Sequence, residues 1–177
     1  MVFVAQIALN GVSMWPMIRR SAMRAILFDP DLRQVLLIKA LVPDTGAQLW
    51  FTPGGGINEG ETELACLARE VAEETGLKEI PAAYPVWRRR EKFVFMGEHY
   101  DQFELYFFVP VSRFEVSERR LEPHETETFM GVQWWSIDEL DQSPEVFVPG
   151  DMAQLLQELE AQWREGRLPA EPQRVGR

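Results

Sequence analysis

Three glutamates near the middle of the chain have the types and spacing best suited to chemistry. Glu70, Glu73 and Glu74 stand at positions i, i+3 and i+4, which share one face of a helix. Three like charges on one face repel one another, so the arrangement favours a divalent cation between them. Oxygen ligands without Cys or His suit Mg²⁺ or Mn²⁺. The spacing predicts a metal site, although a solvated acidic helix face would show the same residues.

Residues just before the glutamates could complete such a site. Three glycines, residues 54–56, follow Pro53, and a loop of this kind can bring a backbone carbonyl close to a ligand. Arg69 lies four residues before Glu73, and Glu61 lies before or within the first turn of the helix. We expect both side chains to orient the metal-binding carboxylates.

The complete pattern resembles the signature of the Nudix hydrolases. Residues 55–77 match G-x5-E-x7-R-E-U-x-E-E-x-G-U, where U is apolar, at every defined position. The resemblance implies hydrolysis of a diphosphate linked to another moiety, often a nucleoside diphosphate, with Mg²⁺ or Mn²⁺. It also implies a role for each matched residue: Glu70 and Glu74 as principal metal ligands, Glu73 as a third ligand or a water contact, the Gly55 carbonyl as a further ligand, and Arg69 and Glu61 as orienting groups.

The same resemblance implies a general base that is either Glu70 or an acidic residue on a loop before a late strand. The acidic stretch before residue 128 offers Glu118, Glu122, Glu125 and Glu127. We favour Glu127 and then Glu125, because they directly precede the strand that leads to Trp134. Metal ions that bridge adjacent phosphates would offset their charge and activate a water for in-line attack on phosphorus.

Apolar periodicity and capping residues predict the elements that position this motif. The predicted strands are 25–28 and 35–38, which form a hairpin, and 48–52, 84–95, 100–111 and 129–135; the predicted helices are 62–75, a short one opened by Ser136, and 151–165. Thr62 is a suitable N-cap and Gly76 a C-terminal stop for the motif helix. This mixture indicates a single α/β or α+β domain. The resemblance implies an α/β/α sandwich with a mixed β-sheet, covered by the motif helix on one side and the C-terminal helix on the other.

The ends of the chain fit the domain less clearly. We expect residues 1–22 to be an N-terminal extension of uncertain role, residues 23–166 to be the Nudix hydrolase domain, and residues 167–177 to be a flexible tail. The apolar start lacks a preceding basic residue and is interrupted by Gln6, Asn10 and Pro16, which argues against a signal peptide or a membrane span. A cytoplasmic location follows as the default expectation.

Composition excludes several classes of protein. The 177 residues carry 18 Lys and Arg against 28 Asp and Glu, a formal net charge of −10. Such a charge disfavours binding to nucleic acid or to anionic membranes. One cysteine and two histidines exclude disulfide scaffolds and most zinc sites. We therefore expect a small nucleotide-type diphosphate as the partner, and the resemblance also allows a homodimer.

Other features carry less weight. Arg88, Arg89 and Arg90 could meet a substrate phosphate, but a solvated strand edge is the better interpretation. Four aromatic residues could stack on a nucleobase, although aromatic residues in strands usually belong to the core: Trp50, Phe51, Trp87 and Trp135. Cys66 is expected to be a small packing residue.

Two other functions fit the same fold. One is a nucleotide-sensing domain without catalytic activity, and the other is a diphosphate isomerase such as isopentenyl diphosphate isomerase. The intact motif disfavours both, and Cys66 lies within the predicted helix, which further disfavours the isomerase. The substrate stays open among nucleotide sugars, dinucleoside polyphosphates, ADP-ribose and oxidised nucleoside triphosphates, because pocket walls come from loops outside the motif.

Overall fold

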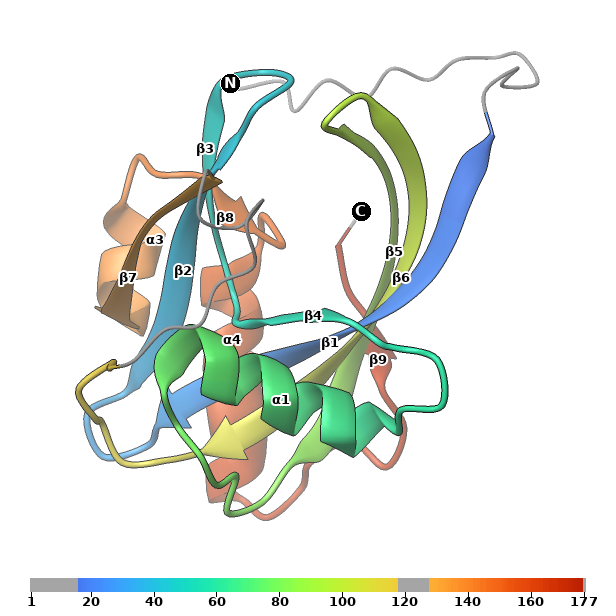
Figure 1. Cartoon of the computed structure of the whole chain (residues 1–177). Coiled ribbons are helices and arrows are strands. Elements are labelled where there is room, and N and C mark those ends of the chain that lie inside the picture. The colour runs from blue at the N-terminus through green and yellow to red at the C-terminus, as the bar shows by residue number, and fades with distance from the viewer. Residues whose placement is uncertain (1–15, 118–127, 177) are drawn as a thin grey trace.

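The computed structural model describes residues 16–117 and 128–176, which form one mixed sheet between helices (Figure 1). The strands are β1 (Met17–Asp29), β2 (Gln34–Val42), β3 (Ala47–Phe51), β4 (Gly54–Gly56), β5 (Tyr84–Phe95), β6 (Glu98–Pro110), β7 (Phe129–Ser136), β8 (Phe147–Val148) and β9 (Gln173–Arg174). Their order is β8-β3-β2-β1-β6-β5-β9, with β4 also paired to β1 and β7 to β2. The long strand β1 therefore joins the two halves of the sheet.

The pairing of β1 decides which segments meet at its centre. It runs parallel to β6, with Ala22 opposite Glu104, and antiparallel to β4, with Arg24 opposite Gly54. At its end, Phe28 pairs with Val35 of β2, as expected of the predicted hairpin. Segments about 30 and 80 residues downstream of Arg24 are thus brought to its two sides.

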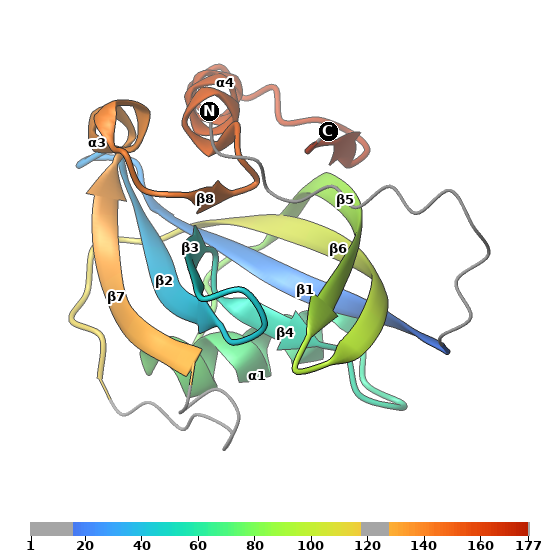
Figure 2. The same ribbon diagram turned by 90° about the horizontal axis from the view of Figure 1, so that it is seen from above.

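Helices cover both faces of the sheet. Figure 2 shows α1 (Glu63–Thr75) on one side and α3 (Ile137–Gln142) and α4 (Met152–Arg164) on the other. This arrangement confirms the α/β/α sandwich with a mixed sheet. Over residues 16–117 and 128–176, no helix has the length and apolar character needed to cross a membrane.

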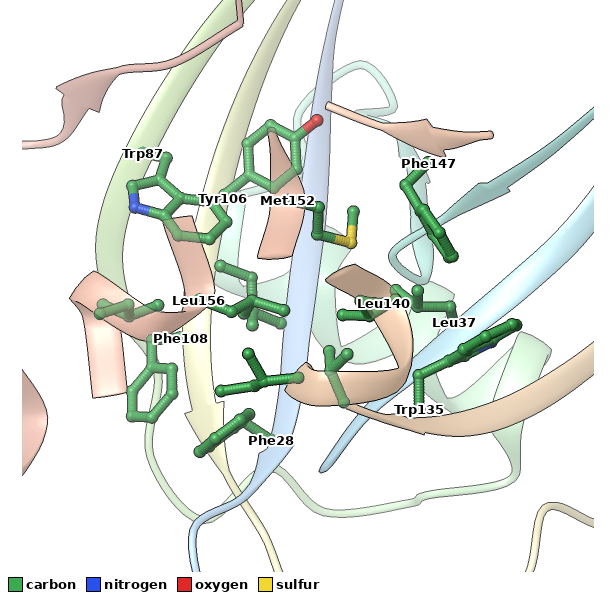
Figure 3. Close-up of a cluster of buried hydrophobic side chains, with 14 of the residues drawn as sticks. Phe28, Leu37, Trp87, Tyr106, Phe108, Trp135, Leu140, Phe147, Met152 and Leu156 are labelled. Carbon is green, nitrogen blue, oxygen red and sulfur yellow. The ribbon is translucent and has the colours of Figure 1, made fainter. Parts of the chain in front are cut away.

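Each face of the sheet has its own hydrophobic core. Phe28 of β1 packs with Tyr106 and Phe108 of β6 and with residues of α4 (Figure 3), and Ile26 belongs to the same cluster. Met23 and Leu27, which alternate with them along β1, pack on the opposite side toward α1. Because side chains alternate along a strand, Arg24 lies on the same face of the sheet as Ile26, next to the apolar core rather than within it.

Helix α1 begins and ends where its capping residues predict. The Thr62 side chain accepts a hydrogen bond from the Ala65 amide at 3.2 Å, and Gly76, at φ 79°, donates from its amide to the Ala72 carbonyl. Cys66, Leu67 and Val71 are fully buried against the sheet. The apolar face of α1 thereby fixes its rotation relative to the glycine strand β4.

Both ends of the described chain take part in the sheet. β1 begins at Met17, and residues 17–22, which the sequence pattern assigns to an extension, pair with residues 99–104 of β6. Near the other end, β9 pairs with β5, and Val175 is buried in the core on the α4 side. Side chains support the pairing, since Ala22 is buried and the Arg20 guanidinium donates to the Gln102 side chain. Neither segment shows the apolar alternation that predicts a strand.

We expect a chain lacking residues 1–22 to unfold at a lower temperature than one lacking residues 1–16. The longer deletion removes the pairing of residues 17–22 with residues 99–104 of β6. It also removes the Ser21 carbonyl, which accepts a hydrogen bond from the Ile57 amide at 3.0 Å. A net loss of about 2 kcal/mol corresponds to a Tm lower by roughly 4–8 °C in a domain of this size. Melting curves followed by circular dichroism measure the difference, and equal Tm values would contradict a structural role for residues 17–22.

Candidate active site

The three glycines form a strand rather than the expected loop. β4 pairs antiparallel with β1, opposite residues 22–24. Gly54 has φ 134°, and a Cβ added there would lie 2.0 Å from the Met23 carbonyl oxygen. Only glycine accepts this backbone conformation and this close approach. The result is a bare strip of backbone that side chains from α1 can reach.

Two glutamates of α1 lie directly against this strip. Glu70 and Glu74 are each only 6% exposed. The Gly54 amide donates to Glu74 Oε2 at 2.7 Å. A Cβ on Gly55 would lie 2.5 Å from Glu70 Oε1, so the Glu70 carboxylate occupies the space that a side chain would need. The two carboxylates that are predicted to bind metal therefore lie against Gly54 and Gly55 of the glycine strand.

Arg69 joins the motif residues to one another. Its Nε and Nη2 donate to the two carboxylate oxygens of Glu61 at 2.9 and 3.0 Å. Nη1 donates to Glu70 at 2.7 Å and to Glu73 at 3.2 Å, while Nη2 also reaches the Gly56 carbonyl at 3.0 Å. A bidentate pair of this kind fixes the plane of the guanidinium. Arg69 thus contacts the groups that the motif predicts it to orient.

The charges around Arg69 shift several pKa values. Hydrogen bonds from Arg69 and from the Asn58 amide lower the pKa of Glu61 to about 2, and the bond to Glu61 raises the pKa of Arg69 above its usual value. Burial, with the nearby charges of Glu70 and Glu61, raises the pKa of the Cys66 thiol to about 11. Cys66 is therefore a neutral, buried thiol at physiological pH, consistent with a packing role.

The structure corrects one step of the sequence argument for a metal. Repulsion among the glutamates was expected to require a cation, but Arg69 supplies a positive charge to Glu70 and Glu73. Within residues 16–117 and 128–176, no group of three or more Asp, Glu, His or Cys side chains is assembled closely enough to hold a metal ion. The candidate metal ligands, which are the carboxylates of α1 and the Gly55 carbonyl, nevertheless all offer oxygen atoms, the ligand type that Mg²⁺ and Mn²⁺ prefer.

A second group of charged residues beside β4 was missed in the sequence. Arg24 donates from Nη1 to the Gly54 carbonyl at 2.7 Å and from Nε to Glu104 at 3.0 Å. Glu104 is buried and also accepts hydrogen bonds from Gln102, Arg89 and Tyr106 at 2.9, 3.1 and 2.8 Å. Arg24 and Glu104 are 80 residues apart in sequence. The sequence carried little signal, because Arg24 lies just before the predicted strand 25–28 and Glu104 is one of two acidic residues in the predicted strand 100–111.

Glu104 makes stability depend on pH. Burial alone would raise its pKa, but Arg24, Arg89 and the Tyr106 hydroxyl lower the pKa from 4.5 to about 2. The ionised Glu104 carboxylate therefore stabilises the folded state. This contribution is fully present above pH 4.5 and is lost progressively as the pH falls toward 2.

We expect the difference in unfolding free energy between the wild type and Glu104→Gln to narrow by up to about 3 kcal/mol as the pH falls through this window. Urea unfolding at a series of pH values measures that difference. A gap that stays constant with pH would contradict the lowered pKa.

The other candidates from the sequence lie mostly in the core or in ion pairs. Trp50, Trp87 and Trp135 are buried, whereas the Phe51 ring faces the Arg24 guanidinium at 5.4 Å. In β5, Arg89 contacts Glu104, and Arg90 makes a bidentate pair with Asp101 at 2.8 and 2.7 Å. Arg89 and Arg90 are thus ion-paired with acidic residues of the sheet. β5 is not a free edge at Trp87 and Arg88, because β9 pairs with it there.

The distal candidate bases lie outside the described residues. This applies to Glu118, Glu122, Glu125 and Glu127. Residues 113–116 come shortly before these glutamates in the sequence. They line a cavity of about 1100 Å³ together with residues of β2 and β7, including Leu36 and Trp134. None of the residues that line this cavity belongs to the glutamate motif.

Comparison with known proteins agrees with the geometry of the motif. The family model described as "NUDIX domain" matches residues 18–159. An RNA pyrophosphohydrolase from Helicobacter pylori (strain G27) is 42% identical over 72 residues, which make up 38% of this chain and 45% of that protein. The chain therefore spans less than half the length of this curated relative.

Solved structures share the fold at low sequence identity. The NUDIX domain of Shewanella oneidensis NrtR, solved with ADP ribose, superposes with a TM-score of 0.59 at 21% identity, covering 93% of this chain and 99% of that one. A MutT NUDIX hydrolase from Burkholderia pseudomallei gives a TM-score of 0.54 at 22% identity, covering 80% of this chain and 97% of that one. Both likenesses concern the fold alone.

Proposed function

Because the chain belongs to the Nudix family, we propose that it hydrolyses the diphosphate bond of a small nucleotide-type substrate with Mg²⁺ or Mn²⁺. The observation that carries the proposal is the contact between the buried carboxylates of α1 and the bare backbone of β4. Glu74 accepts from the Gly54 amide, and Glu70 packs on Gly55. These contacts bring the acidic residues of the motif against its glycines, which the sequence pattern alone does not show.

We assign the roles that the motif implies to the residues in this arrangement. Glu70 and Glu74 would be the principal ligands, with Glu73 as a third ligand or a water contact and the Gly55 carbonyl as a further ligand. When bound, Mg²⁺ or Mn²⁺ would offset the phosphate charge and lower the pKa of a water. The general base would be Glu70 or Glu127.

Arg69 and Glu61 would act as orienting groups. The pKa of Glu61 is about 2, so this carboxylate stays ionised and keeps its bidentate pair with Arg69 over the whole physiological range. The same guanidinium holds one oxygen of Glu70 at 2.7 Å. Glu61 therefore fixes Arg69, and Arg69 in turn limits the rotation of the Glu70 carboxylate.

The substrate would be a nucleoside diphosphate linked to another moiety or a nucleoside triphosphate. The relative from Helicobacter pylori is named for activity on RNA, and one structural neighbour was solved with ADP ribose. The net charge of −10 favours a small substrate over a long nucleic acid, because a polyanion is repelled at a distance. Short 5′-triphosphorylated RNA, ADP-ribose, nucleotide sugars, dinucleoside polyphosphates and oxidised nucleoside triphosphates form the test panel.

We expect the purified protein to cleave a diphosphate bond in at least one member of this panel with Mg²⁺ or Mn²⁺, so that each of the two products keeps part of the phosphate chain. Turnover should be slow at neutral pH and faster under alkaline conditions, because a metal-activated water must lose a proton. Product analysis by chromatography over a pH series measures this. A folded sample that binds ADP-ribose without cleaving any panel member would instead support the nucleotide-sensing alternative.

A further inference from the structure

A buried ion pair lies on the opposite side of β4 from α1's contact with Gly54. Arg24 and Glu104 belong to neighbouring strands of the sheet, and their side chains are 15% and 4% exposed. Neither residue belongs to the glutamate motif. Buried charges of this kind are costly unless they are fully paired, which raises the question of what this pair does.

Glu104 is held so firmly that it can serve as a fixed anchor. Its Oε1 accepts from Arg24 at 3.0 Å and from Gln102 at 2.9 Å. Its Oε2 accepts from Arg89 at 3.1 Å and from the Tyr106 hydroxyl at 2.8 Å. With four donors around one carboxylate, Glu104 has little freedom to rotate, and the Arg24 guanidinium is fixed with it.

The other end of the Arg24 guanidinium holds the backbone of β4. Arg24 Nη1 donates to the Gly54 carbonyl at 2.7 Å. That carbonyl belongs to the peptide between Gly54 and Gly55. The preceding peptide carries the Gly54 amide, which donates to Glu74, and its Pro53 carbonyl accepts from the Ala25 amide at 2.7 Å. The following peptide carries the Gly55 carbonyl.

A fixed point at Gly54 matters because glycine has the least restricted backbone of any residue. Gly54 has φ 134°, a conformation that glycine adopts readily. Rotation about the Gly54 backbone bonds would change the orientation of the Gly55 carbonyl relative to the Gly54 amide that donates to Glu74. A hydrogen bond from a buried guanidinium removes that freedom. The ladder with β1 positions the strand, and Arg24 sets the orientation of one of its peptides.

We propose that Arg24, anchored by Glu104, is a positioning residue that fixes the Gly54–Gly55 peptide and thereby the placement of Glu74 and of the Gly55 carbonyl for metal binding. This inference rests on the proposed function, since it concerns the same metal site. It assigns Arg24 no contact with substrate. Arg24 acts through the glycine strand, and Glu104 acts through Arg24.

The test is Mn²⁺ affinity in the absence of substrate, measured by titration calorimetry on the wild type and Arg24→Met. Methionine keeps much of the packing volume but makes neither hydrogen bond. We expect the dissociation constant for Mn²⁺ to rise by about 10–100-fold, the range found when partners of metal ligands are removed. We expect kcat to fall by a similar factor, with KM changed less than about threefold.

Two further variants keep the test sharp. Arg24→Lys retains the positive charge beside Glu104 but cannot reproduce the rigid two-ended fork, so we expect it to stay folded with Mn²⁺ affinity lowered on the order of tenfold. Arg90→Met removes a bidentate pair with Asp101 in the adjacent strands without touching β4, and it should leave Mn²⁺ affinity unchanged. The double variant Arg24→Met with Glu104→Gln should bind Mn²⁺ no more weakly than Arg24→Met alone, since Glu104 acts through Arg24.

The outcomes separate this inference from the proposed function. If the wild type binds no Mn²⁺ and cleaves no substrate, both are overturned. If the wild type binds Mn²⁺ and the folded Arg24→Met and Arg24→Lys variants bind it equally well, this inference alone is overturned. Unchanged Mn²⁺ affinity with a raised KM would assign Arg24 to the substrate and would likewise overturn the positioning role.

Discussion

We expect Glu70→Gln to lower kcat by about 10²–10⁴-fold, the range for loss of a general base. We also expect added metal to raise the turnover of this variant less than that of the wild type. The change keeps the shape of the side chain, which is 6% exposed and packed on Gly55. It removes the negative charge that a divalent cation would need and the basicity that a proton acceptor would need. It also turns the ion pair with Arg69 at 2.7 Å into a weaker neutral contact. Steady-state turnover with Mg²⁺ and with Mn²⁺ measures the effect.

Glu63→Gln is the matched control for this variant. Glu63 lies in the first turn of the same helix and is exposed to solvent. Its replacement should change the unfolding free energy by no more than about 0.5 kcal/mol and leave turnover unchanged. If Glu70→Gln keeps turnover within threefold of the wild type, Glu70 is neither a required ligand nor the base, and Glu127 becomes the residue to test.

Helix α1 shows what local sequence determines. Its boundaries depend on Thr62 and Gly76, which act on backbone groups within four residues. The same locality made the contact between Arg69 and Glu73 predictable from their spacing of four residues. The shorter contact of Arg69 with its neighbour Glu70 does not follow from spacing, because adjacent residues do not normally face each other on a helix.

The Arg24–Glu104 pair shows what local sequence does not determine. Its formation depends on the parallel register of β1 and β6, which connects residues about 80 positions apart. Both strands carry several charged residues, and their order along the chain does not indicate which of them will pair. The pairing of β4 with β1 was missed for a related reason, because three glycines have no side-chain alternation and read as a loop.

The tail shows the same limit at the edge of the sheet. β9 consists of only Gln173 and Arg174, which is too short for any periodicity to indicate a strand. Its position follows from hydrogen bonds with β5, including the one from the Val175 amide to the Arg88 carbonyl at 3.0 Å. Two exposed residues thus join the sheet while the next side chain, Val175, enters the core.

The glycine strand offers the clearest separation of activity from stability. A Cβ at Gly55 would lie 2.5–2.6 Å from the carboxylate atoms of Glu70, so Gly55→Ala must displace that carboxylate. A carboxylate is the mobile end of a flexible side chain, and it can move with little cost to the fold. We therefore expect Gly55→Ala to lower kcat and Mn²⁺ affinity by about 10–100-fold while the unfolding free energy falls by no more than about 1 kcal/mol.

Gly56→Ala is the control in the same strand. A Cβ at Gly56 would have its nearest neighbour, the Ser21 carbonyl oxygen, at 4.0 Å, so the added methyl group displaces nothing. We expect this variant to keep turnover and Mn²⁺ affinity within threefold of the wild type. Thermal unfolding and Mn²⁺ titration on both variants make the comparison. Equal turnover of the two variants would show that the Glu70 carboxylate need not lie against Gly55, because only the change at Gly55 moves that carboxylate.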